Sequence, residues 1–317
     1  MRFAWVGVHA EGIPPFEAVL ATGVPIQAVL TLRPDLAARR SGHADYRPLC
    51  QRRGVPLHYI ANVNDAESLA LLRDLAPDVA FVIGWHQLVR EPALRLARVG
   101  MLAAHASLLP RYRGSAPINW ALIRGERETG NSLVWLTGDP ERSELVDQRV
   151  IPITPYDTCA TLYAQVAATT REMLLRLLPR LLAGERPGTP LPPPTEPPMP
   201  RRRPADGLVD WTRSSREIYD FVRALTRPYP GAFSVLDGHR WLVWRAALPP
   251  PSAARTAPPG VIVGTVVSPV SEACGILVAC GAGTLQLLEI EDEHGVILSG
   301  RALSEQPWTG RRWGVRD

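Results

Sequence analysis

Residues 65–83, DAESLALLRDLAPDVAFVI, place a helical pattern directly before an apolar run, and this succession decides the fold. Apolar residues recur at helical spacing over 65–75, after an Asp that can cap the first turn. The run at 78–83 predicts a buried strand, and the upstream runs 3–8 (FAWVGV) and 26–30 (IQAVL) predict two earlier strands. Strands that alternate with helices predict a mostly parallel sheet covered by helices over the first 150 residues.

The second half of the chain changes character after a long helical pattern at 158–182. The proline-rich stretch 190–200, PLPPPTEPPMP, cannot continue a helix and predicts an extended spacer. We therefore place a domain boundary near residue 205, with a first domain at 1–205 and a second at 206–317. In the second domain, a helix is expected at 214–225, and short β-rich runs between glycine turns predict a small antiparallel barrel. These runs are 241–244, 260–264, 276–279 and 285–288.

Composition excludes several classes of chemistry. All 35 basic side chains are arginine, so Schiff-base formation, pyridoxal-phosphate catalysis and a Walker-type phosphate loop, which need lysine, are excluded. Gly7 and Gly12 do not form the G-x-G-x-x-G loop of dinucleotide sites. The net charge is +4, but the arginines are scattered and only 201–203 form a dense run, which argues against a nucleic-acid partner.

Compartment and metal content follow from other features of the sequence. No stretch approaches about 18 uninterrupted apolar residues, and the start of the chain leads straight into a strand pattern, so we expect a cytoplasmic protein without a membrane partner. The four cysteines lack the spacing of a redox pair or a zinc knuckle, so they are expected to be buried thiols and no metal is expected.

The densest cluster of unusual residues is 104–114, AHASLLPRYRG, which follows the strand-like run 99–103. In open α/β sheets, the carboxyl edge of the strands is where ligands bind. His105 at this edge is either a catalytic residue or a satisfied structural histidine. Arg111 and Arg113 suit an anionic substrate, and a solvated loop explains them equally well.

Four stretches in order carry a family resemblance that covers nearly the whole chain. Residues 107–130 (SLLPRYRGSAPINWALIRGERETG) are similar to the central signature of the formyltransferases that use 10-formyltetrahydrofolate. Residues 84–89 (GWHQLV) resemble the loop that borders their folate pocket, and 201–211 (RRRPADGLVDW) and 224–233 (ALTRPYPGAF) resemble their linker and carboxy-terminal domain. The second half is more similar to the enzymes that formylate amino sugars than to methionyl-tRNA formyltransferase.

The resemblance implies a Rossmann-like formyltransferase domain followed by an OB-like barrel, and a cleft in which an amine attacks the formyl carbon carried by the folate. The family uses an asparagine, a histidine two residues later and a more distant aspartate; here these positions hold Ala103, His105 and Glu141. The resemblance makes His105 and Glu141 the catalytic pair and implies no metal. Implied contacts with the folate donor are Trp85, His86, Gln87, Leu88, Ala103, Gly138 and Asp139. Implied contacts with the acceptor are Ser107, Arg111, Arg113 and Gly114.

The two departures from the family pattern differ in their consequences. Glu141 keeps the carboxylate but moves it by one methylene, and a misplacement of about 1 Å can cost about a hundredfold in rate. Ala103 has no hydrogen-bond donor, and losing one oxyanion donor costs about 10² to 10³ in rate. Asp139 is a second candidate carboxylate if the loop is shifted, although an Asp in a Gly-Asp-Pro turn is commonly a turn-former.

Three hypotheses remain open from the sequence. The first is formyl transfer from a tetrahydrofolate to a small-molecule amine, such as a nucleotide-linked amino sugar or a secondary metabolite. The second is changed chemistry on the same fold, such as formimidoyl, carbamoyl or other acyl transfer. The third is a catalytically silent binding homologue. Methionyl-tRNA formylation is a weaker option because it requires a basic face, and a homodimer is expected by resemblance only.

Overall fold

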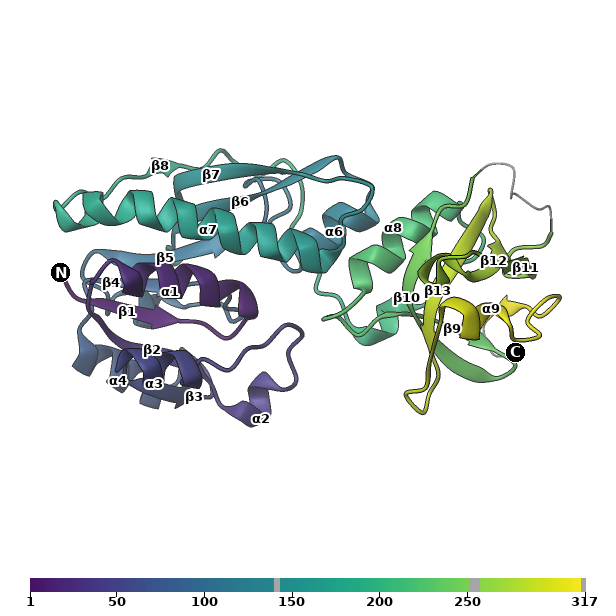
Figure 1. Ribbon diagram of the computed structural model, residues 1–317. Coiled ribbons are helices and arrows are strands. Elements are labelled where there is room, and N and C mark those ends of the chain that lie inside the picture. Colours follow the sequence, from purple (N-terminus) through teal and green to yellow (C-terminus); the bar gives the residue numbers. More distant parts are fainter. Residues whose placement is uncertain (140–142, 251–256, 315–317) are drawn as a thin grey trace. The chain divides into compact units, whose positions relative to one another are not determined.

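The protein is described by a computed structural model that covers residues 1–139, 143–250 and 257–314 (Figure 1). The chain forms two compact units. Unit 1 comprises Met1–Pro117, Glu128–Pro152 and Thr161–Met199. Unit 2 comprises Ile118–Arg127, Ile153–Ala160 and the chain from Pro200 onward.

Unit 1 is built on an eight-stranded sheet with the spatial order β3-β2-β1-β4-β5-β6-β7-β8. The strands are β1 (Phe3–Val6), β2 (Ile26–Leu32), β3 (Leu57–Ile60), β4 (Val79–Val82), β5 (Gly100–His105), β6 (Glu128–Trp135), β7 (Glu144–Pro152) and β8 (Thr189–Pro190). The five strands from β3 to β5 run parallel, and β6, β7 and β8 continue the sheet in antiparallel fashion. The expectation of a mostly parallel sheet is confirmed.

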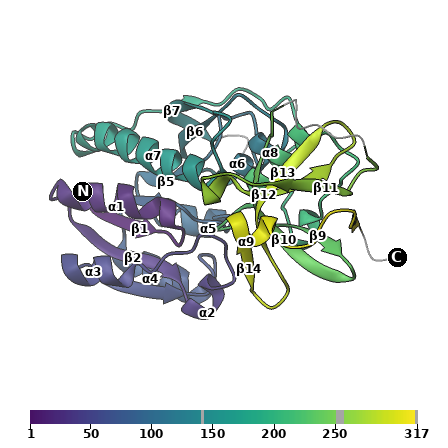
Figure 2. The ribbon, with the colours of Figure 1, turned by 45° about the vertical axis from the view of Figure 1, so that its right-hand side comes forward.

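Helices cover both faces of this sheet. One apolar cluster joins the sheet to α1 (Ile13–Ala21), α3 (Arg47–Arg53) and α7 (Cys159–Leu182), and both views show α1 and α7 side by side (Figures 1 and 2). A second cluster joins the opposite face to α4 (Ala66–Leu75) and α5 (Glu91–Leu94). Two further α-helices in the described part of residues 1–200 are α2 (Pro34–Ala37) and α6 (Pro117–Ile123), and most of α6 belongs to unit 2.

The helix and strand expected at 65–83 both form. Asp65 caps α4, because its Oδ1 accepts a hydrogen bond from the Ser68 amide at 2.8 Å. Leu72 on α4 is fully buried, and every residue of β4 is buried, as an apolar run between two layers of helix requires. Local patterning is therefore sufficient for these two elements.

Unit 2 contains a separate antiparallel sheet with the order β11-β12-β13-β10-β9-β15. Its elements are α8 (Ser215–Leu225), β9 (Ala232–Leu236), β10 (His239–Ala247), β11 (Ile262–Val266), β12 (Gly275–Ala279), β13 (Thr284–Glu291), β14 (Ile297–Ser299), α9 (Gly300–Ser304) and β15 (Trp313–Gly314). A bridge between Val261 and Arg312 joins the two ends of the strand path, with backbone bonds of 2.8 Å on either side. This closure supports a barrel, whereas its OB-like type stays a prediction.

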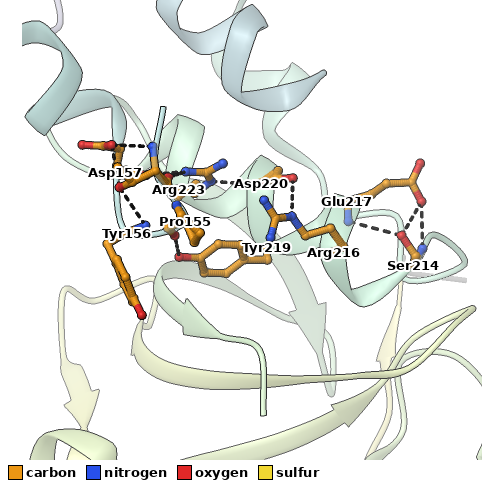
Figure 3. A network of polar contacts seen from close by, with 10 residues as sticks. Pro155, Tyr156, Asp157, Ser214, Arg216, Glu217, Tyr219, Asp220 and Arg223 are labelled. Atoms are coloured by element: carbon orange, nitrogen blue, oxygen red, sulfur yellow. Dashed lines mark hydrogen bonds and ion pairs between the residues drawn. The ribbon is translucent and has the colours of Figure 1, made fainter. Parts of the chain in front are cut away.

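A buried polar network fixes the segment 153–157 to α8 within unit 2 (Figure 3). Arg223 pairs with Asp220 at 2.7 Å, and both side chains are only 4% exposed. The Arg223 guanidinium also donates to the Thr154 and Asp157 carbonyls at 2.8 Å. Because a buried charge is tolerated only when it is paired and hydrogen-bonded, this network holds the segment firmly.

Within the described residues, no helix has the length and apolar character needed to cross a membrane.

Candidate active site

The candidate site lies at the carboxyl edge of the parallel strands in unit 1. Strand β5 ends at His105, and its backbone pairs with Ser132 of the antiparallel strand β6. Side chains alternate along a strand, so Ala103 and His105 lie on the same face of β5. Ala103 packs against the same apolar cluster as Trp85, which places the expected folate loop on that face.

His105 is held in one tautomer by the loop that follows it. Its Nε2 lies 3.2 Å from the Tyr112 carbonyl, which can only accept, so Nε2 carries the proton and Nδ1 carries the lone pair. Burial lowers the pKa of His105, and the hydrogen bond to Tyr112 partly opposes this shift. The imidazole is therefore neutral at physiological pH, with Nδ1 able to accept a proton.

The loop after β5 is fixed by polar contacts that the sequence did not reveal. The Ser132 hydroxyl donates to the Ser107 carbonyl at 2.6 Å and accepts from the Leu109 amide at 3.1 Å. Gln148 of β7 donates to the same hydroxyl at 2.8 Å and to the Leu109 carbonyl at 3.0 Å. Ser107 is 1% exposed and its hydroxyl donates to the Arg111 carbonyl. The side chain of Ser107, an expected contact with the amine substrate, therefore points into the protein.

The end of the loop meets the end of the proline-rich segment. Gly114 forms a bridge with Met199, and a Cβ at Gly114 would lie 2.5 Å from the Met199 carbonyl oxygen. Its φ of +106° also requires glycine. Arg111 is exposed and forms an ion pair with Glu128 at 3.7 Å, while the Arg113 carbonyl accepts from the Met199 amide. The acceptor contacts expected at these residues stay predictions.

The expected folate loop follows β4. Gln87 anchors it, since its side chain accepts from the Val63 amide and donates to the Ala61 carbonyl, both at 3.0 Å. His86 and Leu88 are exposed, whereas Trp85 is partly buried and its ring lies 5.6 Å from that of His86. The Trp85 Nε1 is buried, and no described residue accepts its hydrogen bond.

The second expected folate segment lies beside the first. A Cβ at Gly138 would lie 3.5 Å from a carboxylate oxygen of Glu91, which opens α5 directly after the folate loop. Asp139 is exposed, and its carbonyl accepts from the Thr137 hydroxyl. Glu141, the expected catalytic carboxylate, lies outside the described residues. The structure thus brings Trp85, Ala103 and His105 to one face, with Gly138 beside α5.

A further pair of titratable residues occupies the end of β1. His9 follows β1, and its side chain is only 17% exposed. Glu11 lies against it and is equally buried. No spacing in the sequence marks this pair, because its burial depends on contacts with residues distant in the chain.

Comparison with known proteins gives two family matches and a set of similar folds. The family model described as Formyl transferase matches residues 22–178, and the model described as Formyl transferase, C-terminal domain, matches residues 202–307.

Among solved structures, HypX from Aquifex aeolicus in complex with tetrahydrofolic acid superposes with a TM-score of 0.66 at 16% identity. The match covers 94% of this chain and 46% of HypX, so the chain spans about half of that protein's length. WlaRD, a sugar 3N-formyl transferase solved in the presence of dTDP and 5-N-formyl-THF, gives a TM-score of 0.62 at 11% identity, covering 93% of this chain and 99% of WlaRD. The N-formyltransferase from Helicobacter canadensis, in complex with folinic acid and dTDP-3-aminofucose, gives 0.61 at 13% identity, covering 90% and 98%.

Proposed function

Because the chain belongs to the formyl transferase family, and is therefore an enzyme of that kind, we propose that it moves a formyl group from 10-formyltetrahydrofolate to an amino group of a small molecule. A nucleotide-linked amino sugar is the acceptor class we favour, since two proteins share the fold over nearly their whole length: WlaRD, a sugar 3N-formyl transferase solved with dTDP, and the Helicobacter canadensis enzyme, solved with dTDP-3-aminofucose. The observation that carries the proposal is the neutral His105 imidazole at the carboxyl edge of β5.

The residues present suit a folate donor. The Trp85 Nε1 is a buried donor on the loop after β4, and a pterin ring offers nitrogen and oxygen acceptors to such a group. Gly138 lies next to Glu91, which directly follows the folate loop in the chain, so Gly138 and this loop line the same region. Trp85 and its neighbours would hold the donor, which supplies the reactive formyl carbon, while the chain's own groups handle protons.

His105 and Glu141 divide the proton transfers in this proposal. With its Nε2–H bound to the Tyr112 carbonyl, His105 presents Nδ1 as a basic nitrogen. The ring can donate a hydrogen bond to the formyl oxygen, and so polarise it, only when Nδ1 is protonated or when the ring rotates to free Nε2–H. Glu141 takes the proton that the attacking nitrogen loses. Ala103 supplies no donor, so formyl transfer is expected to be slow by about 10² to 10³ relative to a site with asparagine there.

Ala103 also favours a second candidate, changed chemistry on the same fold. Its side chain packs against apolar residues and offers nothing to a developing oxyanion. A donor that brings its own hydrogen bond, as in formimidoyl or carbamoyl transfer, makes the missing asparagine less costly. A silent binding homologue is the third candidate; its mark is tight ligand binding without turnover. Partners beyond the amine, including a second copy of the chain, remain proposals.

The experiment is a formylation assay with purified protein, 10-formyltetrahydrofolate and a panel of nucleotide-linked amino sugars that includes dTDP-3-aminofucose. We expect slow formation of tetrahydrofolate, loss of turnover in His105→Ala with donor binding retained, and faster turnover in Ala103→Asn. Absence of donor binding and of formylation in both wild type and Ala103→Asn refutes the proposal. Turnover that is unaffected by His105→Ala refutes the assigned role of the histidine.

A further inference from the structure

The sheet of unit 1 reverses its order beside β1, and two titratable residues lie there. The chain proceeds from β1 to β2 and β3 on one side, then returns to β4 on the other side of β1. Open α/β sheets bind ligands in the crevice at such a switch point. His9 and Glu11 follow β1 directly, so both lie at the mouth of this crevice.

The strand register places the end of β4 beside the last residues of β5. Val82, the last residue of β4, pairs with Ala103, and Gly84 begins the loop that follows β4. The Val8 and His9 amides both donate to the Gly84 carbonyl, at 3.1 and 3.0 Å. The axes of β1 and β5 are two strand spacings apart, about 10 Å.

The side chain of Glu11 lies against Gly84, in the loop that follows β4, and β4 is the strand between β1 and β5. A Cβ added to Gly84 would be 3.3 Å from the Glu11 Cγ, and its φ is +63°. Glycine at position 84 therefore leaves the space that the Glu11 side chain uses. The Glu11 side chain thus lies on the β4 side of β1, at the carboxyl edge of the sheet where β5 ends at His105.

The Glu11 carboxyl has an oxygen that nothing in the described part of the chain satisfies. Its Oε2 is buried and receives no hydrogen bond from a described residue. The nearest basic atom, His9 Nδ1, lies 3.7 Å away and already accepts a hydrogen bond from the Glu11 amide at 3.2 Å. Because Nδ1 then carries a lone pair, it cannot donate to the carboxyl in that state.

Burying a carboxyl group that receives no hydrogen bond lowers the stability of the fold, so we expect a bound ligand to supply the missing donor. Burial raises the pKa of Glu11, and the nearby His9 partly opposes this shift. Among the described residues, Tyr46, which precedes α3, also interacts with Glu11, and its pKa is raised mainly by burial. An ammonium group offers the charge and the donors that this carboxyl lacks.

We propose that Glu11 is the carboxylate that receives the acceptor's amino group and takes its first proton, an inference that rests on the proposed function. The ammonium form gives one proton to Oε2, which leaves a neutral amine and a neutral carboxylic acid. The amine nitrogen then forms the bond to the formyl carbon as the bond from that carbon to the folate nitrogen breaks. The nitrogen's second proton, which the proposed function assigns to Glu141, ends on the folate nitrogen, and Glu11 returns its proton to solvent.

The test compares Glu11→Gln with Glu17→Gln, an exposed substitution on α1 that serves as the matched control. The full chain is assayed with 10-formyltetrahydrofolate and dTDP-3-aminofucose from pH 7 to about pH 10, where aliphatic ammonium groups titrate. We expect kcat/KM of Glu11→Gln to be about a hundredfold below the control at neutral pH and to recover as the amine loses its proton. Glu11→Asp retains a carboxylate and is expected to fall between the two.

The outcomes separate this inference from the function on which it rests. Hydrolysis of the donor by water needs no amine, so Glu11→Gln is expected to keep the control's hydrolysis rate. Equal kcat/KM in the two glutamine variants, or a loss that persists unchanged at high pH, overturns the role of Glu11 while formyl transfer stands. Wild-type protein that neither binds nor uses the donor overturns both.

Discussion

Replacing Ser132 with alanine tests whether the loop after β5 is positioned by the sheet beneath it. The Ser132 hydroxyl makes three hydrogen bonds, to the Ser107 carbonyl, the Leu109 amide and the Gln148 side chain. The residue is fully buried, so no solvent replaces these contacts when the hydroxyl is removed. At about 0.5 to 1.5 kcal/mol for each of the three bonds, the expected loss in free energy of unfolding is about 1.5 to 4.5 kcal/mol.

The same substitution is expected to slow turnover. The loop from Ser107 to Tyr112 carries the carbonyl that fixes the His105 tautomer, so a shift of about 1 Å is expected to lower kcat/KM by about a hundredfold. Urea denaturation measures the first effect and the formylation assay measures the second. Ser299→Ala is the control, because this exposed hydroxyl caps no backbone amide and its loss is expected to change stability by less than about 0.5 kcal/mol.

Two results refute this reasoning. Unchanged stability in Ser132→Ala shows that the three contacts contribute nothing. A stability loss of the expected size with unchanged kcat/KM shows that the loop does not position His105.

Three further predictions concern the frame of the site. Burial lowers the pKa of His105 below its value near 6.5 in the unfolded chain, so the unfolded chain binds more protons in this range. The free energy of unfolding should therefore fall as the pH drops from about 6.5 to the pKa of the folded protein. Urea denaturation at several pH values is expected to show a weaker pH dependence in His105→Gln. Gly114→Ala should destabilise more than Gly23→Ala, since both have positive φ but only the first meets backbone; equal losses in denaturation refute the close approach. Asp220→Ala should lower the free energy of unfolding by about 3 to 5 kcal/mol, because it leaves the Arg223 charge buried and unpaired. Adding Arg223→Met should restore part of this stability. A double variant that is no more stable than Asp220→Ala contradicts the unpaired charge as the cause.

The elements of the fold could be predicted where their cause is local. The apolar run at 26–30 became β2, which extends to Leu32, and the Asp65 cap and helix formed as the pattern requires. Such elements are predictable because period and capping are properties of adjacent residues. Unit 2 also takes in 118–127 and 153–160, and no local pattern in these two stretches indicates this.

The site was predictable only in part. His105 lies at the strand end that the motif indicated, but the contacts that fix the loop after it come from Ser132 and Gln148, which are brought together by strand register. The side chain of Glu11 packs in the same way against Gly84, which lies in the loop after β4. Contacts of this kind join residues far apart in sequence, and no local pattern encodes them.

The most direct measurement is the mass spectrum of the amine product formed with 10-formyltetrahydrofolate labelled with carbon-13 in its formyl group. Our account predicts that the acceptor gains the mass of one CO and that this carbon carries the label. A product with another added mass, or a formylated product without the label, contradicts formyl transfer from the folate donor.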